Sequence, residues 1–154
     1  MKVKTRWLTP PGQRAWRAVV GVHQGLPGVL ARALQDCGNL SITDYVVLVA
    51  LTDGPDGLHF QDLASTVQWE WSRMSHHLRR MAKRGLVTRE ECPKGGRGAH
   101  VVVTPGGCAA IETAAPRHVA TVRRLVIDPL SPEELDMLTV LCERILGRLE
   151  ADRP

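Results

Sequence analysis

The sequence predicts a mostly helical fold of the α+β class, in which one short β-hairpin lies among longer helices. Two observations predict it. Apolar residues recur at helical spacing over most of the 154 residues, and the period changes to two only at "LVTRE" (86–90) and "HVVVT" (100–104). Between these segments, "CPKGGRGA" holds three glycines and a proline. We therefore expect two strands joined by a long hairpin tip.

The first helix is expected to begin at Pro10, with Thr9 as its N-cap residue. Apolar residues then continue at helical spacing to about Gln35. Pro27 lies inside this stretch and predicts a kink, because proline removes one backbone hydrogen bond and clashes with the preceding turn.

The middle of the chain predicts three shorter helices. Ser41 and Asp44 are close to a capping box ahead of the apolar segment "YVVLVALT". Residues 59–67 predict a short amphipathic helix, and residues 71–84 predict another. Gly85 is expected to end that helix in the left-handed conformation that glycine adopts easily. Helix, turn, helix and hairpin in this order form the winged helix-turn-helix pattern, here with a two-stranded β-wing.

Helical spacing returns after residue 104 and continues to about Ile127, with Pro116 as a candidate kink. Ser131 then predicts the N-cap of a last helix. The outer helices carry apolar stripes, and no second core is visible to cover them. We expect a dimerisation surface, and folding back on the middle block is the alternative. Its residues are Leu8, Leu135, Leu138, Leu141, Ile145 and Leu149.

These elements divide the chain into two regions. Residues 1–40 and 105–154 are expected to form a helical dimerisation region, with residues 41–104 as the winged helix-turn-helix domain. Charge is segregated along the chain, since residues 1–36 hold six Lys and Arg against one acid, whereas residues 130–154 hold three against six. This segregation suits a molecule with one basic face.

The composition is that of an ordinary globular protein, with 44% hydrophobic and 23% charged residues. A net charge of +4 and a pI of about 9.2 permit an anionic partner. The N-terminus lacks the apolar core of a signal peptide, and no apolar run approaches the ~18 residues of a membrane span. The four cysteines contain no C-x-x-C pair. We expect a cytoplasmic protein with no membrane association, metal or cofactor.

The segment "WSRMSHHLRRMAKRGLV" (71–87) concentrates five Lys and Arg, with no acid from Ser72 to Arg84. On a helical wheel centred on Met74, an inward face forms and the basic residues lie opposite it. The inward residues are Met74, Trp71, Leu78, Met81 and Ala82. The outward stripe is Ser72, His76, Arg79, Arg80 and Lys83, flanked by Arg73 and Arg84.

Three interpretations compete for this stripe. A metal site is disfavoured because the adjacent histidines His76 and His77 point about 100° apart on a helix. A merely solvated face normally mixes charges of both signs, and this one does not. A recognition helix in the DNA major groove fits best, because Arg and Lys reach guanine edges and phosphates, while Ser and His add hydrogen bonds.

The hairpin tip supports the recognition-helix interpretation. Lys94 and Arg97 lie on this glycine-rich tip, from which an arginine can enter a neighbouring minor groove. The alternative for the tip alone is an ordinary hairpin whose charges provide solubility.

With these elements placed, the sequence resembles the MarR family of bacterial transcriptional regulators over roughly residues 8–150. The resemblance depends on "LSITDYVVLVAL", "DLASTV", "SRMSHHLRRMAKRGLVTREECPKGGRGAHVVVTPGG" and "LSPEEL". It implies a homodimer, held by the first and last helices, on a pseudo-palindromic operator. It also implies that the protein usually represses transcription and is released by a small phenolic or other amphipathic effector.

Carried over position by position, the resemblance implies two sets of contacts. Residues matching the DNA-facing part of the family's recognition helix and wing are Ser72, Arg73, Ser75, His76, Arg79, Lys83 and Arg97. Trp16 and His23 lie near the family's ligand crevice and are candidate effector contacts. The family's wing commonly reads Asp-x-Arg, and Gly95 replaces the acid here. This departure predicts a weaker contribution from the wing.

We therefore expect a homodimeric DNA-binding transcriptional regulator, most simply a repressor, without enzymatic activity. The first alternative is a winged-helix interaction module that uses its basic face on an acidic protein partner. An enzyme is the second alternative, and no Ser/His/Asp set, phosphate loop or paired-carboxylate motif supports it.

Overall fold

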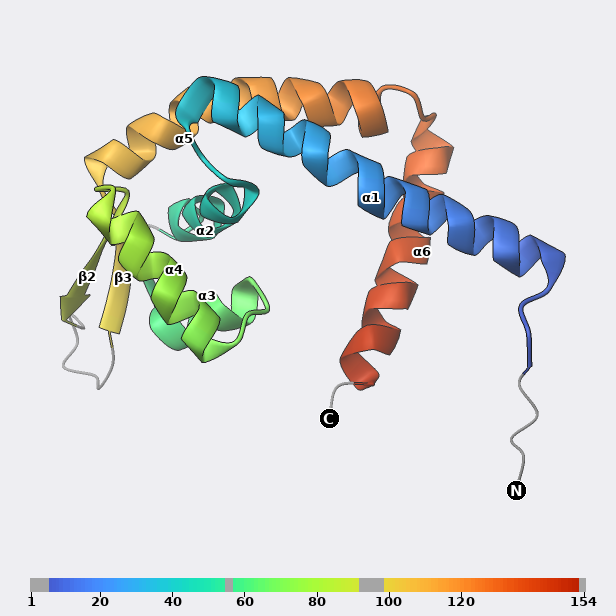
Figure 1. The fold of residues 1–154 in the computed structure, drawn as a ribbon, viewed down its shortest axis with the longest axis horizontal. Coiled ribbons are helices and arrows are strands. Elements are labelled where there is room, and N and C mark those ends of the chain that lie inside the picture. The colour runs from blue at the N-terminus through green and yellow to red at the C-terminus, as the bar shows by residue number, and fades with distance from the viewer. Residues whose placement is uncertain (1–5, 55–56, 92–98, 153–154) are drawn as a thin grey trace.

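The structure is a computed structural model that describes residues 6–54, 57–91 and 99–152. Within these ranges the chain is mostly helical with one small sheet, which confirms the predicted class (Figure 1). The elements in chain order are α1 (Pro10–Gly38), α2 (Ile42–Thr52), β1 (Leu58–His59), α3 (Phe60–Thr66), α4 (Trp71–Lys83), β2 (Val87–Glu91), β3 (Ala99–Val103), α5 (Pro105–Val122), the π-helical segment η1 (Arg123–Ile127) and α6 (Pro132–Ala151).

The ends of α1 follow from its capping residues. Thr9 Oγ1 accepts a hydrogen bond from the Gly12 amide at 3.4 Å, as the predicted N-cap should. The helix ends at Gly38, somewhat later than expected, where Asn39 adopts the left-handed conformation with φ of 48°. Asparagine tolerates this conformation better than most residues do. Pro27 lies inside α1, and the helix continues through it without interruption.

Local sequence also determines the ends of α2 and α4. At the start of α2, the Asp44 amide donates to Ser41 Oγ at 3.0 Å, and the Ser41 amide donates to Asp44 Oδ2 at 2.9 Å. This is the predicted capping box. At the end of α4, Arg84 is the C-cap residue and Gly85 follows with φ of 70°. Glycine stops the helix where the sequence predicts, because only glycine adopts this φ without steric cost.

The sheet has three strands in the described residues, one more than the two strands of the predicted wing. β2 and β3 form the expected antiparallel hairpin, with Val87 opposite Val103. β1 pairs with the other edge of β3, with Leu58 opposite Val101. A strand of two residues has no alternation that a sequence pattern can detect. Its pairing gives β3 a hydrogen-bonded neighbour on both edges.

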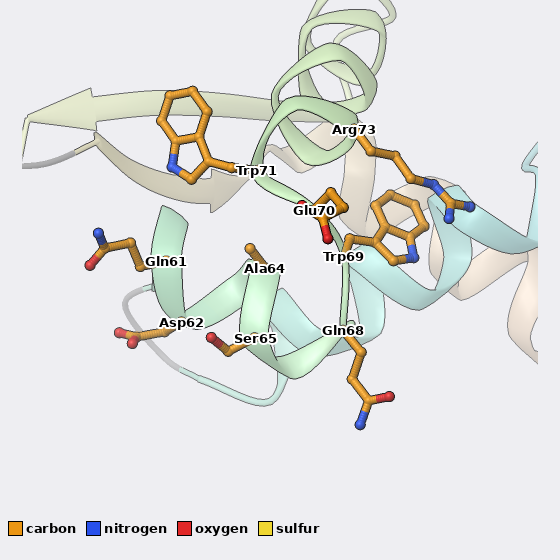
Figure 2. Close-up of a pocket in the computed structure, with 9 residues that line it drawn as sticks. All are labelled: Gln61, Asp62, Ala64, Ser65, Gln68, Trp69, Glu70, Trp71 and Arg73. Atoms are coloured by element: carbon orange, nitrogen blue, oxygen red, sulfur yellow. The ribbon is translucent and has the colours of Figure 1, made fainter. Parts of the chain in front are cut away.

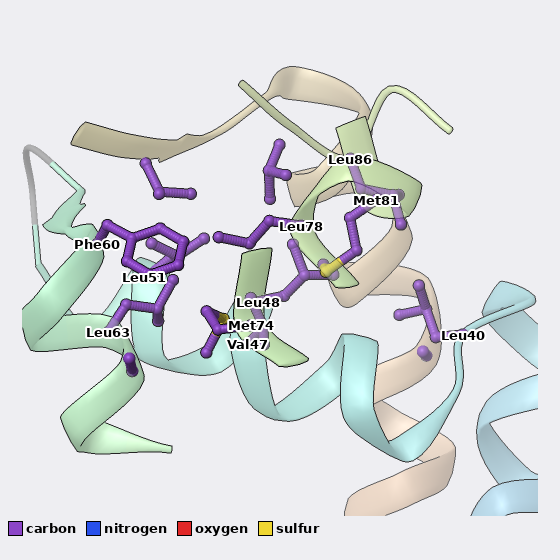
Figure 3. Close-up of a cluster of buried hydrophobic side chains, with 14 of the residues drawn as sticks. Leu40, Val47, Leu48, Leu51, Phe60, Leu63, Met74, Leu78, Met81 and Leu86 are labelled. Carbon is purple, nitrogen blue, oxygen red and sulfur yellow. The ribbon is translucent and has the colours of Figure 1, made fainter. Parts of the chain in front are cut away.

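The hydrophobic core lies between α2, α3, α4 and the sheet (Figure 3). Leu48 of α2, Leu63 of α3, Leu78 of α4 and Val101 of β3 are completely buried in it. Burying one such side chain stabilises the fold by about 1.5–3 kcal/mol. α4 is therefore held by apolar contacts along one face and presents its other face to solvent.

α5 connects the outer helices to this block by lying along the C-terminal part of α1 (Figure 1). Arg117 on α5 pairs with Asp36 on α1, with 3.0 Å between Nη2 and Oδ2. Tyr45 on α2 stacks against His118 on α5, with ring centroids 4.4 Å apart. α5 thus touches both α1 and α2 at the point where the middle block begins.

α6 begins with the N-cap that the sequence predicts, since Ser131 and Glu134 form a capping box. The helix has no buried residue, although apolar side chains run along its whole length. The predicted dimerisation residues are exposed in the single chain, apart from half-buried Leu135: Leu8, Leu138, Leu141, Ile145 and Leu149. α6 therefore does not fold back on the middle block. Within the described ranges, no helix is long and apolar enough to cross a membrane.

Candidate DNA-binding surface

The two faces of α4 differ as the sequence predicts, with two corrections. Met74, Leu78 and Met81 are fully buried. Trp71 and Ala82 were placed on the inward face, and both are exposed, Trp71 to 63%. Both lie roughly 60–80° from Met74 around the helix, at the edge of the inward face.

A histidine occupies the core position that the sequence interpretation missed. His77 is only 6% exposed. The wheel contained the signal, since His77 is three residues after Met74 and four before Met81 and so falls on the same face. This signal was overlooked because His77 follows another histidine, His76, and the two were weighed together as a possible metal site. His76 points outward and is exposed.

The predicted DNA-facing residues of α4 line its outer side. Ser75 is half-buried, and the exposed members are Ser72, Arg73, His76, Arg79, Arg80 and Lys83. No acidic residue interrupts them from Ser72 to Lys83. Of the predicted hairpin-tip contacts, Lys94 and Arg97 lie outside the described residues.

Aromatic rings hold the start of α4. The guanidinium of Arg73 lies over the Trp69 ring, 4.4 Å from its centroid, and the Trp69 and His77 rings are nearly perpendicular with centroids 5.3 Å apart. Trp71 packs on Phe60 of α3, with ring centroids 4.8 Å apart. Cation–π contacts of this kind are worth about 0.5–1 kcal/mol at exposed sites. Both tryptophans thus brace the helix against α3, even though the Trp71 side chain remains largely in solvent.

Arg89 on β2 is a further basic residue beside this surface that the sequence interpretation did not single out. Its Nη2 donates to Ser75 Oγ at 3.4 Å, and its guanidinium lies 5.5 Å from the Phe60 ring centroid. Arg89 lies on β2, outside the basic segment of α4, and nothing in the sequence of that strand indicates a DNA contact. Only the packing of β2 against α4 brings it next to Ser75.

An acid lies beneath α4 and links it to α2. Asp44 Oδ1 is 3.0 Å from His77 Nε2, and Asp44 Oδ2 is 2.7 Å from Arg84 Nη1. Burial, the largest single influence, raises the pKa of this carboxyl. Contacts with His77, Arg84 and Ser41 together outweigh burial and hold the pKa well below its usual range. Asp44 is therefore a buried carboxylate that stays ionised.

Arg84 completes this arrangement by turning inward. Its second terminal nitrogen, Nη2, donates to the carbonyl oxygen of Asn39, the residue that ends α1. The sequence places Arg84 beside the basic stripe, but both of its terminal guanidinium nitrogens contact other elements of the fold. One arginine thus joins the ends of α1, α2 and α4.

A concave pocket of about 940 Å³ opens between α3 and the start of α4 (Figure 2). Its lining mixes charges, since Asp62 and Glu70 lie there together with Arg73. Amides and a hydroxyl complete it, from Gln61, Gln68 and Ser65. This lining has no net preference for an anion, and the basic surface is therefore the outer side of α4 and not this pocket.

The other predicted sites lie away from α4. Trp16, 59% exposed, and His23, also exposed, are on the N-terminal half of α1, which extends away from the middle block (Figure 1). Their role as effector contacts remains a prediction. Among the described residues, no three His, Cys, Asp or Glu side chains are grouped so that they could hold a metal ion.

The order of elements and the placement of α4 define a winged helix-turn-helix protein with additional outer helices. A family model described as MarR family matches residues 39–98. The chain is 38% identical to AbsC, a MarR family transcriptional regulator from Streptomyces coelicolor, over 96% of this chain and 100% of that one, with a TM-score of 0.91. A comparison with curated proteins gave no match.

Two further solved structures resemble it. Sco3205, a MarR family transcriptional regulator from Streptomyces coelicolor solved in complex with DNA, is 34% identical, covering 97% of this chain and 93% of that one, with a TM-score of 0.88. CouR from Rhodococcus jostii RHA1, bound to p-coumaroyl-CoA, is 21% identical over 83% of this chain and 88% of its own, with a TM-score of 0.74, and shares the fold. The chain belongs to the MarR family of transcriptional regulators.

Proposed function

We propose that the protein binds double-stranded DNA as a homodimer and represses transcription from a pseudo-palindromic operator. The observation that carries this proposal is the outer side of α4, a basic surface without an acid, on a helix whose inner face buries Met74, Leu78 and Met81. Arginine and lysine on such a helix bind phosphates and guanine edges in the major groove. The similarity to Sco3205, which was solved with DNA, supports the proposal.

The homodimer is supported by the apolar surface of α6. Leu141 and Ile145 are four residues apart and therefore share one face, and Ile145 is 53% exposed. Exposed apolar side chains in such number are rare on monomeric proteins and mark an interaction surface. A second copy that covers α6 would present two α4 helices, which fit two half-sites about 34 Å apart, or one turn of DNA.

DNA binding is tested by fluorescence anisotropy on DNA from upstream of the protein's own gene and on scrambled DNA of the same length. We expect a preference for the upstream DNA and an affinity that falls steeply between ~50 and ~200 mM salt. Equal and weak binding to both DNAs would contradict the proposal. It would favour the second reading of the basic surface, as a module that binds an acidic protein.

Variants connect this binding to α4. Arg79→Ala and Lys83→Ala should each weaken binding to the upstream DNA by about fivefold or more while leaving the melting temperature unchanged. Arg32→Ala is the matched control, because Arg32 is an exposed arginine on α1 and away from α4. If both α4 variants bind like the wild type, α4 is not the recognition helix.

Dimerisation is tested by light scattering coupled to size-exclusion chromatography. Ile145→Glu places a charge on the apolar face of α6 and should convert a dimer into monomers or aggregates, because a buried unpaired charge is strongly unfavourable. Glu143→Ala is the control, since Glu143 lies about 200° from Leu141 around the helix. A wild-type protein that elutes as a stable monomer would contradict the dimer.

Release by an effector is the third part of the proposal. It depends on the family resemblance and on the exposed position of Trp16. Titrating small phenolic and other amphipathic compounds into the DNA complex should identify one that releases DNA, and Trp16→Ala and His23→Ala should then weaken that response. Release that is unaltered in both variants would place the effector elsewhere.

A further inference from the structure

We infer that His77 and Asp44 are positioning residues for DNA recognition, and that they orient the guanidinium of Arg80 from inside the protein. The inference rests on the proposed function, since it concerns how α4 meets DNA. It assigns a role to two side chains that do not themselves reach the surface of α4.

The four side chains form a continuous chain of polar contacts from the surface to the interior. Arg80 Nη2 lies 3.0 Å from His77 Nδ1, and His77 Nε2 lies 3.0 Å from Asp44 Oδ1. Arg84 Nη1 lies 2.7 Å from the other carboxylate oxygen, Oδ2. We call these four residues, Arg80, His77, Asp44 and Arg84, the polar relay. Only Arg80 belongs to the predicted DNA-facing residues.

The direction of each hydrogen bond follows from the donors present. A guanidinium has only donors, so His77 Nδ1 must accept from Arg80. The ring then carries its hydrogen on Nε2, which lies 3.0 Å from Asp44 Oδ1 but outside hydrogen-bond geometry, so the contact on this side is electrostatic. This tautomer offers an acceptor to Arg80 and an N–H to the side of Asp44. A protonated ring has two donors and no acceptor, and so it cannot hold Arg80.

A purely structural role does not account for histidine at this position. His77 lies among Met74, Leu78 and Met81, where an apolar side chain would fill the core without desolvating a polar ring. A buried ion pair is weak evidence for stability, because desolvation offsets much of the attraction between the charges. Histidine adds a hydrogen-bond acceptor at a fixed position, and this acceptor orients the Arg80 guanidinium.

The acceptor at His77 Nδ1 preorganises the Arg80 side chain for binding DNA. A free arginine side chain has four rotatable bonds, and it loses this freedom when it binds a phosphate or a base. Arg80 already has one nitrogen fixed at His77 and keeps its remaining donors for DNA. It should therefore lose less conformational entropy on binding. Asp44 in turn holds His77 from the first turn of α2, which the Ser41 capping box fixes.

The test is a double-mutant cycle measured as DNA affinity. His77→Gln can place its amide nitrogen where Nε2 lies, beside Asp44, and its carbonyl oxygen then points away from the Nδ1 position, so Arg80 loses its acceptor there. We expect Arg80→Ala to weaken binding about tenfold in the wild type and only about twofold in the His77→Gln background. Arg79→Ala is the matched comparison and should weaken binding by the same factor in both backgrounds. A purely structural role for His77 would make both arginine substitutions additive.

A second route does not depend on His77→Gln being folded. Asp44→Asn removes the charge that holds His77, and it also alters the cap of α2. Ser41→Ala is its control, because it removes the cap bond to the Asp44 amide and leaves the relay intact. We expect Arg80→Ala to lose most of its effect in the Asp44→Asn background and to keep it in the Ser41→Ala background.

The outcomes separate the two levels of the proposal. A wild type without preference for any DNA overturns the proposed function, and the relay's role falls with it. A wild type that binds specifically, with additive effects of Arg80→Ala in both the His77→Gln and the Asp44→Asn backgrounds, overturns only the role of the relay. An Arg80→Ala variant that binds DNA as well as the wild type also overturns only the role of the relay.

Discussion

Replacing Arg84 by methionine removes a guanidinium that bonds to two other elements, the Asp44 carboxylate and the Asn39 carbonyl. Breaking a fully buried ion pair from one side costs about 3–5 kcal/mol. Here only one partner is buried, since the Asp44 side chain is 3% exposed and that of Arg84 is 40% exposed. Water therefore screens the arginine, and we discount the cost to about 2 kcal/mol.

Such a loss is measurable by urea or thermal unfolding at fixed protein concentration, because the stability of a dimer depends on concentration. About 2 kcal/mol should lower the melting temperature by about 4–8 °C for a chain of this length. Lys83→Met is the control. It removes a neighbouring positive charge from the same helix, at an exposed position for which no ion pair is found among the described residues. If Arg84→Met melts like Lys83→Met, the inward contacts of Arg84 contribute nothing to stability.

Arg84→Met should also change how the stability of the protein depends on pH. The pKa of Asp44 in the folded protein lies below its ordinary value of 3.8. As the pH falls, the Asp44 carboxylate is therefore protonated first in the unfolded chain. The stability that Asp44 contributes is complete above about pH 3.8 and is lost as the pH falls from there through the pKa of the folded protein. Arg84→Met removes one of the hydrogen bonds that lower this pKa, and so it should show a smaller loss of stability on acidification. An equal or larger loss would contradict this assignment.

Three further predictions concern single positions. Gly107→Ala should destabilise the fold by about 1–3 kcal/mol in urea unfolding, because the new methyl group would overlap the Leu86 carbonyl oxygen, and wild-type stability would show that this contact yields easily. Gln68 has φ of 55°, so Gln68→Gly should be more stable than Gln68→Val by about 1–2 kcal/mol, and the reverse order would contradict the left-handed turn. Burial against Tyr45 lowers the pKa of His118, so its ring should titrate below 6.5 by NMR, and titration at or above that value would rule out the burial.

Patterns that are local in sequence predicted most of the fold. The caps at Thr9, Ser41 and Ser131 and the stop at Gly85 depend on a few neighbouring residues, and the structure confirms each of them. The hairpin was predicted for the same reason, since period-two alternation is a property of the strand itself. β1 was missed because two residues form a strand only when β3 is already beside them.

The candidate DNA-binding surface likewise has a part that the sequence predicts and a part that only the tertiary structure shows. The outward stripe of α4 was visible from helical spacing alone, because its residues are neighbours on one helix. Arg89 was not, because nothing in its own segment marks it and only tertiary packing brings it to Ser75. The polar relay is similar: Asp44 looked like a capping residue, and its contacts with His77 and Arg84 span 33 and 40 residues of sequence.

By itself, the sequence determined the helices, their capped ends at Thr9, Ser41, Ser131 and Gly85, the hairpin and the family, since these depend on periodicity, capping and motifs that neighbouring residues carry. The tertiary structure alone decided which charged residues remain on the surface. Arg79 and Lys83 remain exposed, while Arg84, one position further along the chain, turns toward a buried carboxylate. The physical reason is that a buried charge persists only with a partner, and a partner 40 residues away becomes a neighbour only when α2 and α4 pack together.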